Sequence, residues 1–219
     1  MKKRIPIKKQ ILSENDKLAQ KLQKKFDTSN TIVVNIMASP GAGKTSIIYQ
    51  LIKQLKTTYS LAVIDGDVVD IDIKKLQSLD IPVALANTGG ACHLDAYMIK
   101  KSLQSIKLHD IDLLIIENVG NLICPANFKL GSHKNIVIAS IPEGSDKPYK
   151  YPQMFLGADL VLLNKTDLLS VTDFDMQQFE KGIKRVNNSV SYIPLSAKTG
   201  VGISNVVTWL STLVSKKLS

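Results

Sequence analysis

The residues with the clearest chemical meaning form a glycine-rich turn that ends in a lysine and a threonine. Residues 38–45 read Ala-Ser-Pro-Gly-Ala-Gly-Lys-Thr and separate an apolar stretch at 31–37 from a helical pattern at 46–55. In such a turn, backbone N–H groups wrap phosphate oxygens, the lysine reaches the terminal phosphate and the threonine hydroxyl can ligate Mg²⁺. Alanine stands at 38, where the usual pattern has glycine, but both cradle glycines are present. We expect a phosphate-binding loop with contacts from Gly41, Ala42, Gly43, Lys44, Thr45 and Ser46.

The base of the nucleotide is indicated by Asn164-Lys165-Thr166-Asp167, which follows the apolar run 160–163. The Asp167 carboxylate can accept hydrogen bonds from the ring N–H and the amine of guanine, whereas adenine lacks that amine and would leave the carboxylate unpaired. The tetrapeptide alone is a weak signal. It gains weight because Ser196-Ala197-Lys198 follows another apolar stretch and is typical of a loop that contacts the guanine carbonyl. We expect GTP and GDP as ligands, with contacts from Asn164, Lys165, Asp167, Ser196, Ala197 and Lys198.

Carboxylates after two apolar runs are candidates for binding Mg²⁺, which takes one or two carboxylates together with phosphate and water oxygens. Asp67 and Glu117 suit this role, and Gly120, just beyond Glu117, can direct its N–H toward the γ-phosphate. For Asp65, turn chemistry is at least as good an explanation as metal contact. We expect Mg²⁺ to be held by Thr45, Asp67 and Glu117, and catalysis to depend on Lys44, Asp67 and Glu117.

Two cysteines and a neighbouring histidine form a second group with possible chemistry. Cys92 and Cys124 are the cysteines of the chain, and His93 adjoins the first. A disulfide is disfavoured in a cytosolic protein, and isolated cysteines are usually core residues. However, Cys92 and His93 lie in a glycine-containing loop that opens a helical pattern, and Cys124 follows the expected γ-phosphate loop. From the residue types, two interpretations are equally good. One is a metal site with two thiolate ligands and one imidazole ligand, and the other is a pair of inert thiols.

The elements that must position these residues are apolar runs that alternate with helical patterns. This alternation predicts an α/β protein with the three-layer P-loop NTPase fold, in which a mostly parallel sheet carries helices on both faces. Binding loops should gather at the carboxyl ends of the strands, where the motifs described above fall. The expected strands lie at 31–37, 61–65, 82–86, 112–117, 135–141, 160–163 and 190–193.

Length and composition fit one well-buried domain, since 44% of the 219 residues are hydrophobic. We predict an N-terminal arm and helix over 1–30 and a GTPase domain over 31–219. No stretch approaches the length of a membrane span and the start lacks the apolar run of a secretory signal, so we expect a cytoplasmic protein without membrane contact. The formal charge of +9 is spread along the chain, and no nucleic-acid-binding module is legible.

Together, these motifs resemble those of the HypB family, the nickel-insertion GTPases of hydrogenase maturation within the SIMIBI class of P-loop GTPases. The resemblance is carried most specifically by the segments 88–96, 117–125 and 146–152. It implies that Cys92, His93 and Cys124 bind Ni²⁺ or Zn²⁺ at the interface of a homodimer that GTP promotes. It further implies that GTP turnover governs nickel transfer, with a second nickel-maturation protein and the hydrogenase large-subunit precursor as partners.

The chain departs from the family pattern in two places. Residues 1–30 contain neither the cysteine-rich motif nor the histidine-rich stretch of some family members, and Val68-Val69 stands where polar residues are usual. Two alternatives from other classes therefore stay open. One is a metal-independent regulatory GTPase, and the other is a maturation GTPase for urease or a cobalamin-dependent mutase, although the Cys-Pro-His arrangement of the urease type is absent.

Expectations for catalysis follow from the basic residues. The arginines of the chain are Arg4 and Arg185, and neither adjoins a nucleotide motif, so we expect slow intrinsic hydrolysis. Lys147 or Lys150 is a candidate for supplying charge across a dimer, from the turn-rich segment 143–152, which we expect to be a mobile or interface loop.

Overall fold

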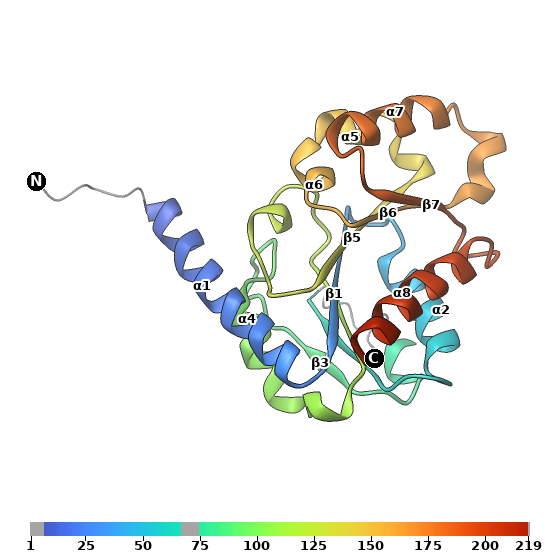
Figure 1. Ribbon diagram of the computed structural model, residues 1–219. Coiled ribbons are helices and arrows are strands. Elements are labelled where there is room, and N and C mark those ends of the chain that lie inside the picture. The colour runs from blue at the N-terminus through green and yellow to red at the C-terminus, as the bar shows by residue number, and fades with distance from the viewer. Residues whose placement is uncertain (1–6, 67–74, 219) are drawn as a thin grey trace, which may run out of the picture.

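The computed structural model describes residues 7–66 and 75–218 and contains, within them, a parallel sheet of seven strands. The strand order is β3-β2-β4-β1-β5-β6-β7, and every paired strand runs parallel to its neighbour (Figure 1). The predicted α/β fold is therefore confirmed, and each strand lies within two residues of its predicted range. The strands are β1 (Ile32–Ala38), β2 (Leu61–Asp65), β3 (Val83–Leu85), β4 (Leu113–Glu117), β5 (Lys134–Ser140), β6 (Leu160–Asn164) and β7 (Ser191–Pro194).

Helices cover both faces of the sheet, as the prediction required (Figure 1). The helices α2 and α8 pack on one face, while α1 and α4 cover one half of the opposite face and α6 and α7 the other half. The α-helices are α1 (Ile7–Thr28), α2 (Lys44–Leu55), α4 (Ala96–Ser102), α5 (Lys147–Lys150), α6 (Pro152–Leu156), α7 (Met176–Val186) and α8 (Ile203–Leu218). Short 3₁₀ turns span Leu103–Ser105, Leu108–Asp110, Pro125–Asn127, Ile141–Glu143 and Thr166–Val171.

The central strands are buried on both faces, which explains their continuous apolar runs. Every residue of β1, β2, β4 and β6 is buried, the pattern of parallel strands that lie between two helix layers. Side chains of β1 alternate between the faces, so Val34 and Ile36 join the cluster under α2, whereas Val33 and Met37 contact the opposite layer. Asn35 points to that opposite layer from between two apolar clusters, which makes it an unusual buried polar residue in the middle of a sheet.

Helix α1 extends from the body at its start and packs onto the domain at its end (Figure 1). Leu22 and Phe26 are buried and Leu18 is partly buried in the same apolar cluster, so their common face of α1 packs against the core. The Asn15 side chain adds a polar attachment, because it donates to the Lys129 carbonyl and accepts from the Ala96 N–H.

His133 is largely enclosed, since its side chain is 15% exposed. Its Nδ1 accepts from the Val33 N–H, and its Nε2 contacts the Asp27 carboxylate at 3.0 Å. The ammonium of Lys217, near the end of α8, lies 3.2 Å from both the Asp27 carboxylate and the His133 ring nitrogen. This cluster joins the end of α1 to the end of α8.

The segment 143–152 is not one long loop, because it contains α5 and the start of α6. Lys150 forms an ion pair with Asp146 at 2.5 Å, and Lys147 lies over the Tyr151 ring at 5.5 Å from its centroid. In the described part of the chain, no helix combines the length and the apolar character needed to cross a membrane.

Candidate nucleotide and metal site

The glycine-rich turn lies between β1 and α2 in a conformation that needs glycine at position 43. Gly43 has φ of 98°, a left-handed conformation that favours glycine, and a Cβ atom there would collide with the Asn164 side-chain amide. Helix α2 begins at the next residue, Lys44, so its first backbone N–H groups lie at the turn. A helix start with unpaired N–H groups and a positive dipole end is suited to bind phosphate.

Residues at the start of α2 lie directly beside the end of β4. The Thr45 hydroxyl donates to the Glu117 carboxylate at 2.7 Å, and both residues are buried, with Glu117 at 1% exposure. A hydroxyl and a carboxylate at the phosphate end of a nucleotide site are oxygen ligands of the kind that Mg²⁺ prefers. Asp67, the other carboxylate predicted for this ion, lies outside the described residues.

Asp65 is a second carboxylate at this edge of the sheet. It ends β2, it is fully buried, and it stands opposite Glu117 in the ladder between β2 and β4. Two carboxylates therefore stand side by side at the carboxyl ends of neighbouring strands, and one of them, Glu117, contacts Thr45 at the start of α2. The signal was present in the sequence, because Asp65 ends an apolar run in the same way as Glu117.

The predicted guanine motifs contact the predicted phosphate loop through side-chain hydrogen bonds. The Asn164 amide donates to the Ala42 carbonyl at 2.8 Å and accepts from the Ala197 N–H at 3.0 Å. Lys165 donates to the Gly41 carbonyl at 2.7 Å. Asn164 and Lys165 thus connect both predicted base loops with the phosphate loop.

The Asp167 carboxylate is held in place by its neighbour across this site. The Ser196 hydroxyl donates to one Asp167 oxygen at 2.6 Å. Both base loops border a cavity of about 510 Å³. Lys75, which the motifs had not singled out, lines the same cavity and lies 3.3 Å from the Ser46 hydroxyl. The cavity is bordered by Gly43, Ser46, Tyr49, Gln50, Lys75, Asn164, Lys165, Asp167, Leu168, Ala197 and Lys198.

The loop after β4 approaches the phosphate loop at Gly120. A Cβ atom on Gly120 would lie 3.2 Å from the Pro40 Cα and 3.3 Å from the Lys44 ammonium. Glycine suits this close approach because it has no side chain, and the Gly120 backbone therefore lies beside Pro40 and Lys44 of the glycine-rich turn. We call residues 117–121 the sensor loop.

Cys92, His93 and Cys124 come together although two loops supply them. Their ligand atoms all lie within 4.8 Å of one another. Cys92 is exposed and Cys124 is half-buried, so Cys92 is not an inert core thiol. Thiolate and imidazole ligands at this separation suit Ni²⁺ or Zn²⁺.

Local contacts hold the candidate metal ligands in position. The His93 ring stacks on Phe128 with centroids 3.7 Å apart, and burial lowers the pKa of His93, which favours the neutral imidazole that can ligate a metal. The Asn121 side chain accepts from the Ile123 and Cys124 N–H groups and so fixes the turn that carries Cys124.

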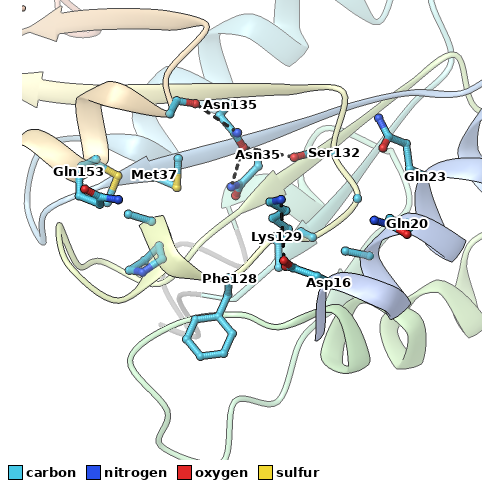
Figure 2. Close-up of a pocket in the computed structure, with 17 residues that line it drawn as sticks. Asp16, Gln20, Gln23, Asn35, Met37, Phe128, Lys129, Ser132, Asn135 and Gln153 are labelled. Atoms are coloured by element: carbon cyan, nitrogen blue, oxygen red, sulfur yellow. Dashed lines mark hydrogen bonds and ion pairs between the residues drawn. The ribbon is translucent and has the colours of Figure 1, made fainter. Parts of the chain in front are cut away.

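Behind this turn lies a cavity of about 320 Å³ between α1, α6 and the sheet (Figure 2). Phe128 lines it, so one side chain borders the cavity and supports His93. Its floor carries Asn35, Asn135 and Ser132, and both Asn35 and Ser132 donate to the Asn135 side-chain oxygen (Figure 2).

Comparison with known proteins places this arrangement in a family. The description "CobW/HypB/UreG, nucleotide-binding domain" matches residues 32–194. The hydrogenase maturation factor HypB of Azotobacter chroococcum mcd 1 is 42% identical over 207 residues, which span 94% of this chain and 68% of that protein. The chain belongs to the HypB family. Both the predicted resemblance and the predicted P-loop fold are therefore confirmed.

Two solved HypB structures share the fold over nearly the whole chain. HypB from Archaeoglobus fulgidus gives a TM-score of 0.88 at 36% identity and covers 92% of this chain and 99% of its own. HypB from Helicobacter pylori, solved in complex with nickel, gives a TM-score of 0.87 at 32% identity and covers 93% and 96%. The fold similarity therefore extends over nearly the whole length of this HypB family member.

Proposed function

We propose that this chain is a GTP-hydrolysing metallochaperone that binds nickel and delivers it during hydrogenase maturation. One observation carries the proposal: residues 117–124 connect the two sites within a single short segment. At its start, Glu117 contacts Thr45 in the phosphate site, and at its end Cys124 lies within 4.8 Å of the ligand atoms of Cys92 and His93. A change at the γ-phosphate therefore has a short physical route to the metal ligands.

The proposed hydrolysis depends on positioning and charge, because phosphoryl transfer needs little covalent chemistry from the protein. Lys44 and the first N–H groups of α2 neutralise phosphate charge, while a water molecule attacks the γ-phosphoryl group in line. Thr45, Glu117 and Asp67 would hold Mg²⁺, which supplies further charge neutralisation when bound. Arg185 lies in α7 and Arg4 lies outside the described residues, so we infer slow intrinsic turnover without an arginine finger from this chain.

The proposed cargo is Ni²⁺, with Zn²⁺ as a competing ion, since thiolate and imidazole ligands suit both. The nickel complex of the Helicobacter pylori relative favours nickel. Three ligands from this chain leave a position for a further ligand, and the exposed Cys92 faces the surface from which a recipient can approach.

We further propose a cytoplasmic homodimer that GTP promotes and that places the metal ligands at its interface. Lys147 or Lys150 would supply charge across this interface, and the recipients would be a second nickel-maturation protein and the hydrogenase large-subunit precursor. Sedimentation with GDP and with a non-hydrolysable GTP analogue tests the dimer. A charge-reversed Lys147 or Lys150 variant that kept the full turnover rate would remove its lysine from the proposal.

The deciding experiment is an equilibrium titration of Ni²⁺ and Zn²⁺ into the reduced protein, once with GDP and once with the GTP analogue. Cys92→Ala and Cys124→Ala variants serve as ligand deletions, and nucleotide binding by both variants is the control for folding. We expect binding that depends on both cysteines and differs between nucleotide states. If neither cysteine variant changed metal binding, the result would instead support a metal-independent GTPase. Equal metal affinity with GDP and with the GTP analogue would refute gating by the nucleotide.

A further inference from the structure

The buried amide of Asn118 connects the sensor loop to the loop that carries Cys92 and His93. Asn118 is fully buried and follows Glu117 directly. Its side-chain oxygen accepts from the Leu94 N–H at 3.1 Å and from the Val119 N–H at 2.9 Å. Leu94 is the residue after His93, so one amide oxygen holds both the backbone beside a metal ligand and the backbone beside the expected γ-phosphate contact.

A chain of hydrogen bonds between asparagine side chains across the sheet fixes the orientation of the Asn118 amide. Asn118 donates to Asn35 at 3.1 Å, and Asn35 in turn donates to Asn135 at 3.1 Å. Asn135 donates to the Gly157 carbonyl at 3.3 Å, and Figure 2 shows the Asn35 and Asn135 part of the line on the cavity floor. Because every amide donates in the same direction, each one determines how the next must point.

The Leu94 side chain is tightly enclosed where the loop after His93 passes the end of β2. Leu94 is fully buried, and a Cβ atom on Gly66, at the end of β2, would lie 2.7 Å from its side chain. A displacement of Asn118 must therefore either carry the Leu94 backbone with it or leave a buried N–H without its acceptor, which is unfavourable.

We propose that Asn118 is the positioning residue that couples the γ-phosphate state to the geometry of Cys92 and His93. The inference rests on the proposed function, because it assumes that the nucleotide changes the metal affinity. It adds how the two sites are connected. The sensor loop acts on Cys124 through the backbone that continues from it, whereas it acts on Cys92 and His93 through the Asn118 side chain. By thermodynamic linkage, metal binding must change nucleotide affinity through the same contact.

The chain provides a matched control in Asn15. This asparagine is 9% exposed and its oxygen accepts from the Ala96 N–H at 2.8 Å, two residues beyond Leu94. Its amide donates to the Lys129 carbonyl instead of to the sensor loop. Asn15 therefore supports the same loop from α1 without touching any residue of the sensor loop through these bonds.

The test measures the Ni²⁺ dissociation constant of the wild-type protein, Asn118→Ala and Asn15→Ala, each with GDP and with a non-hydrolysable GTP analogue. The ratio of the two constants is the readout, since loss of stability alone changes both constants together. We expect a wild-type ratio of about 5 or more, in the range usual for allosteric coupling. Asn118→Ala should bring the ratio within about twofold of one, whereas Asn15→Ala should keep the wild-type ratio.

The outcomes separate the two proposals. A wild-type ratio of one would refute nucleotide gating itself. A clear wild-type ratio that Asn118→Ala retains, or that Asn15→Ala loses equally, would refute only the role of Asn118.

A second measurement needs no variant and covers the case in which Asn118→Ala does not fold. Amide hydrogen exchange in the wild-type protein compares the Leu94 N–H, which Asn118 accepts, with the Ala96 N–H, which Asn15 accepts. We expect the exchange rate of Leu94 to differ between the GDP and GTP-analogue states and that of Ala96 to stay constant. Equal rates at Leu94 in both states of a protein that shows gated metal binding would overturn the inference.

Discussion

Replacement of Asp167 by asparagine tests whether this residue selects guanine. The Ser196 hydroxyl donates to one Asp167 oxygen at 2.6 Å and fixes the carboxylate beside the 510 Å³ cavity. Guanine offers two donors to that carboxylate, and a hydrogen bond to a charged group contributes about 1.5–3 kcal/mol. Loss of both contributions, about 3–6 kcal/mol, should weaken GDP binding by about 10²- to 10⁴-fold in Asp167→Asn.

Xanthine carries a carbonyl in place of the guanine amine, so the new amide should bind xanthosine diphosphate better than the native carboxylate does. Competition titrations with a fluorescent nucleotide measure both ligands, and thermal unfolding verifies that the variant is folded. Ser196→Ala is the matched control, because it keeps the carboxylate and should cost about tenfold or less in GDP affinity. A loss below tenfold in Asp167→Asn, or no gain for the xanthine nucleotide, would refute the assignment of the base site.

Three other expectations concern the phosphate loop, the metal ligands and the α1–α8 cluster. Gly43→Ala should lower GDP affinity by more than about tenfold in a nucleotide titration, because φ is 98° and the new methyl group meets Asn164; near-normal affinity would contradict the loop geometry. Phe128→Ala removes the 3.7 Å stack on His93 and should weaken Ni²⁺ binding by about 2- to 12-fold in a competition assay, whereas Phe128→Tyr should keep it. Burial lowers the pKa of His133 in the folded protein, so the unfolded chain binds a proton there more readily. The contribution of neutral His133 to the free energy of unfolding is therefore complete above the ordinary histidine pKa of 6.5. It is lost as pH falls through the folded pKa, and urea unfolding between pH 7 and 5 should show a weaker pH dependence in His133→Gln than in the wild type.

The strands and the nucleotide loops were predictable from the sequence because their signals are local. Apolar runs mark strands that are buried on both faces, and the spacing of Lys44 and Thr45 after the glycines reflects what a phosphate requires. Asn164 and Asp167 likewise carry their chemistry in one tetrapeptide. The family resemblance was equally legible, because the segments around Cys92 and Cys124 are specific.

What the sequence did not reveal depends on contacts between distant segments. Asn35 and Asn135 read as isolated polar residues in apolar runs, and only the register of β1 with β5 makes them partners. The burial of His133 follows from the packing of α1 and α8 around it, which no local pattern encodes. The position of Asp65 beside Glu117 likewise follows from the register of β2 with β4, which no local pattern shows.

The connection from β4 to β5 has a consequence for how the protein can be altered. Residues 118–133 cross from one strand to another with a single 3₁₀ turn, Pro125–Asn127, as their helical element, and the cavity of Figure 2 lies between this connection and the sheet. Cys124 and Phe128 therefore belong to a connection rather than to the framework of the fold. Ligands could be exchanged in residues 121–128 to redesign metal selectivity, while the strands that carry the nucleotide loops keep their sequence. The part of the proposed metal site that this connection supplies, Cys124, can therefore be redesigned without changing the strands, while Cys92 and His93 remain on their own loop.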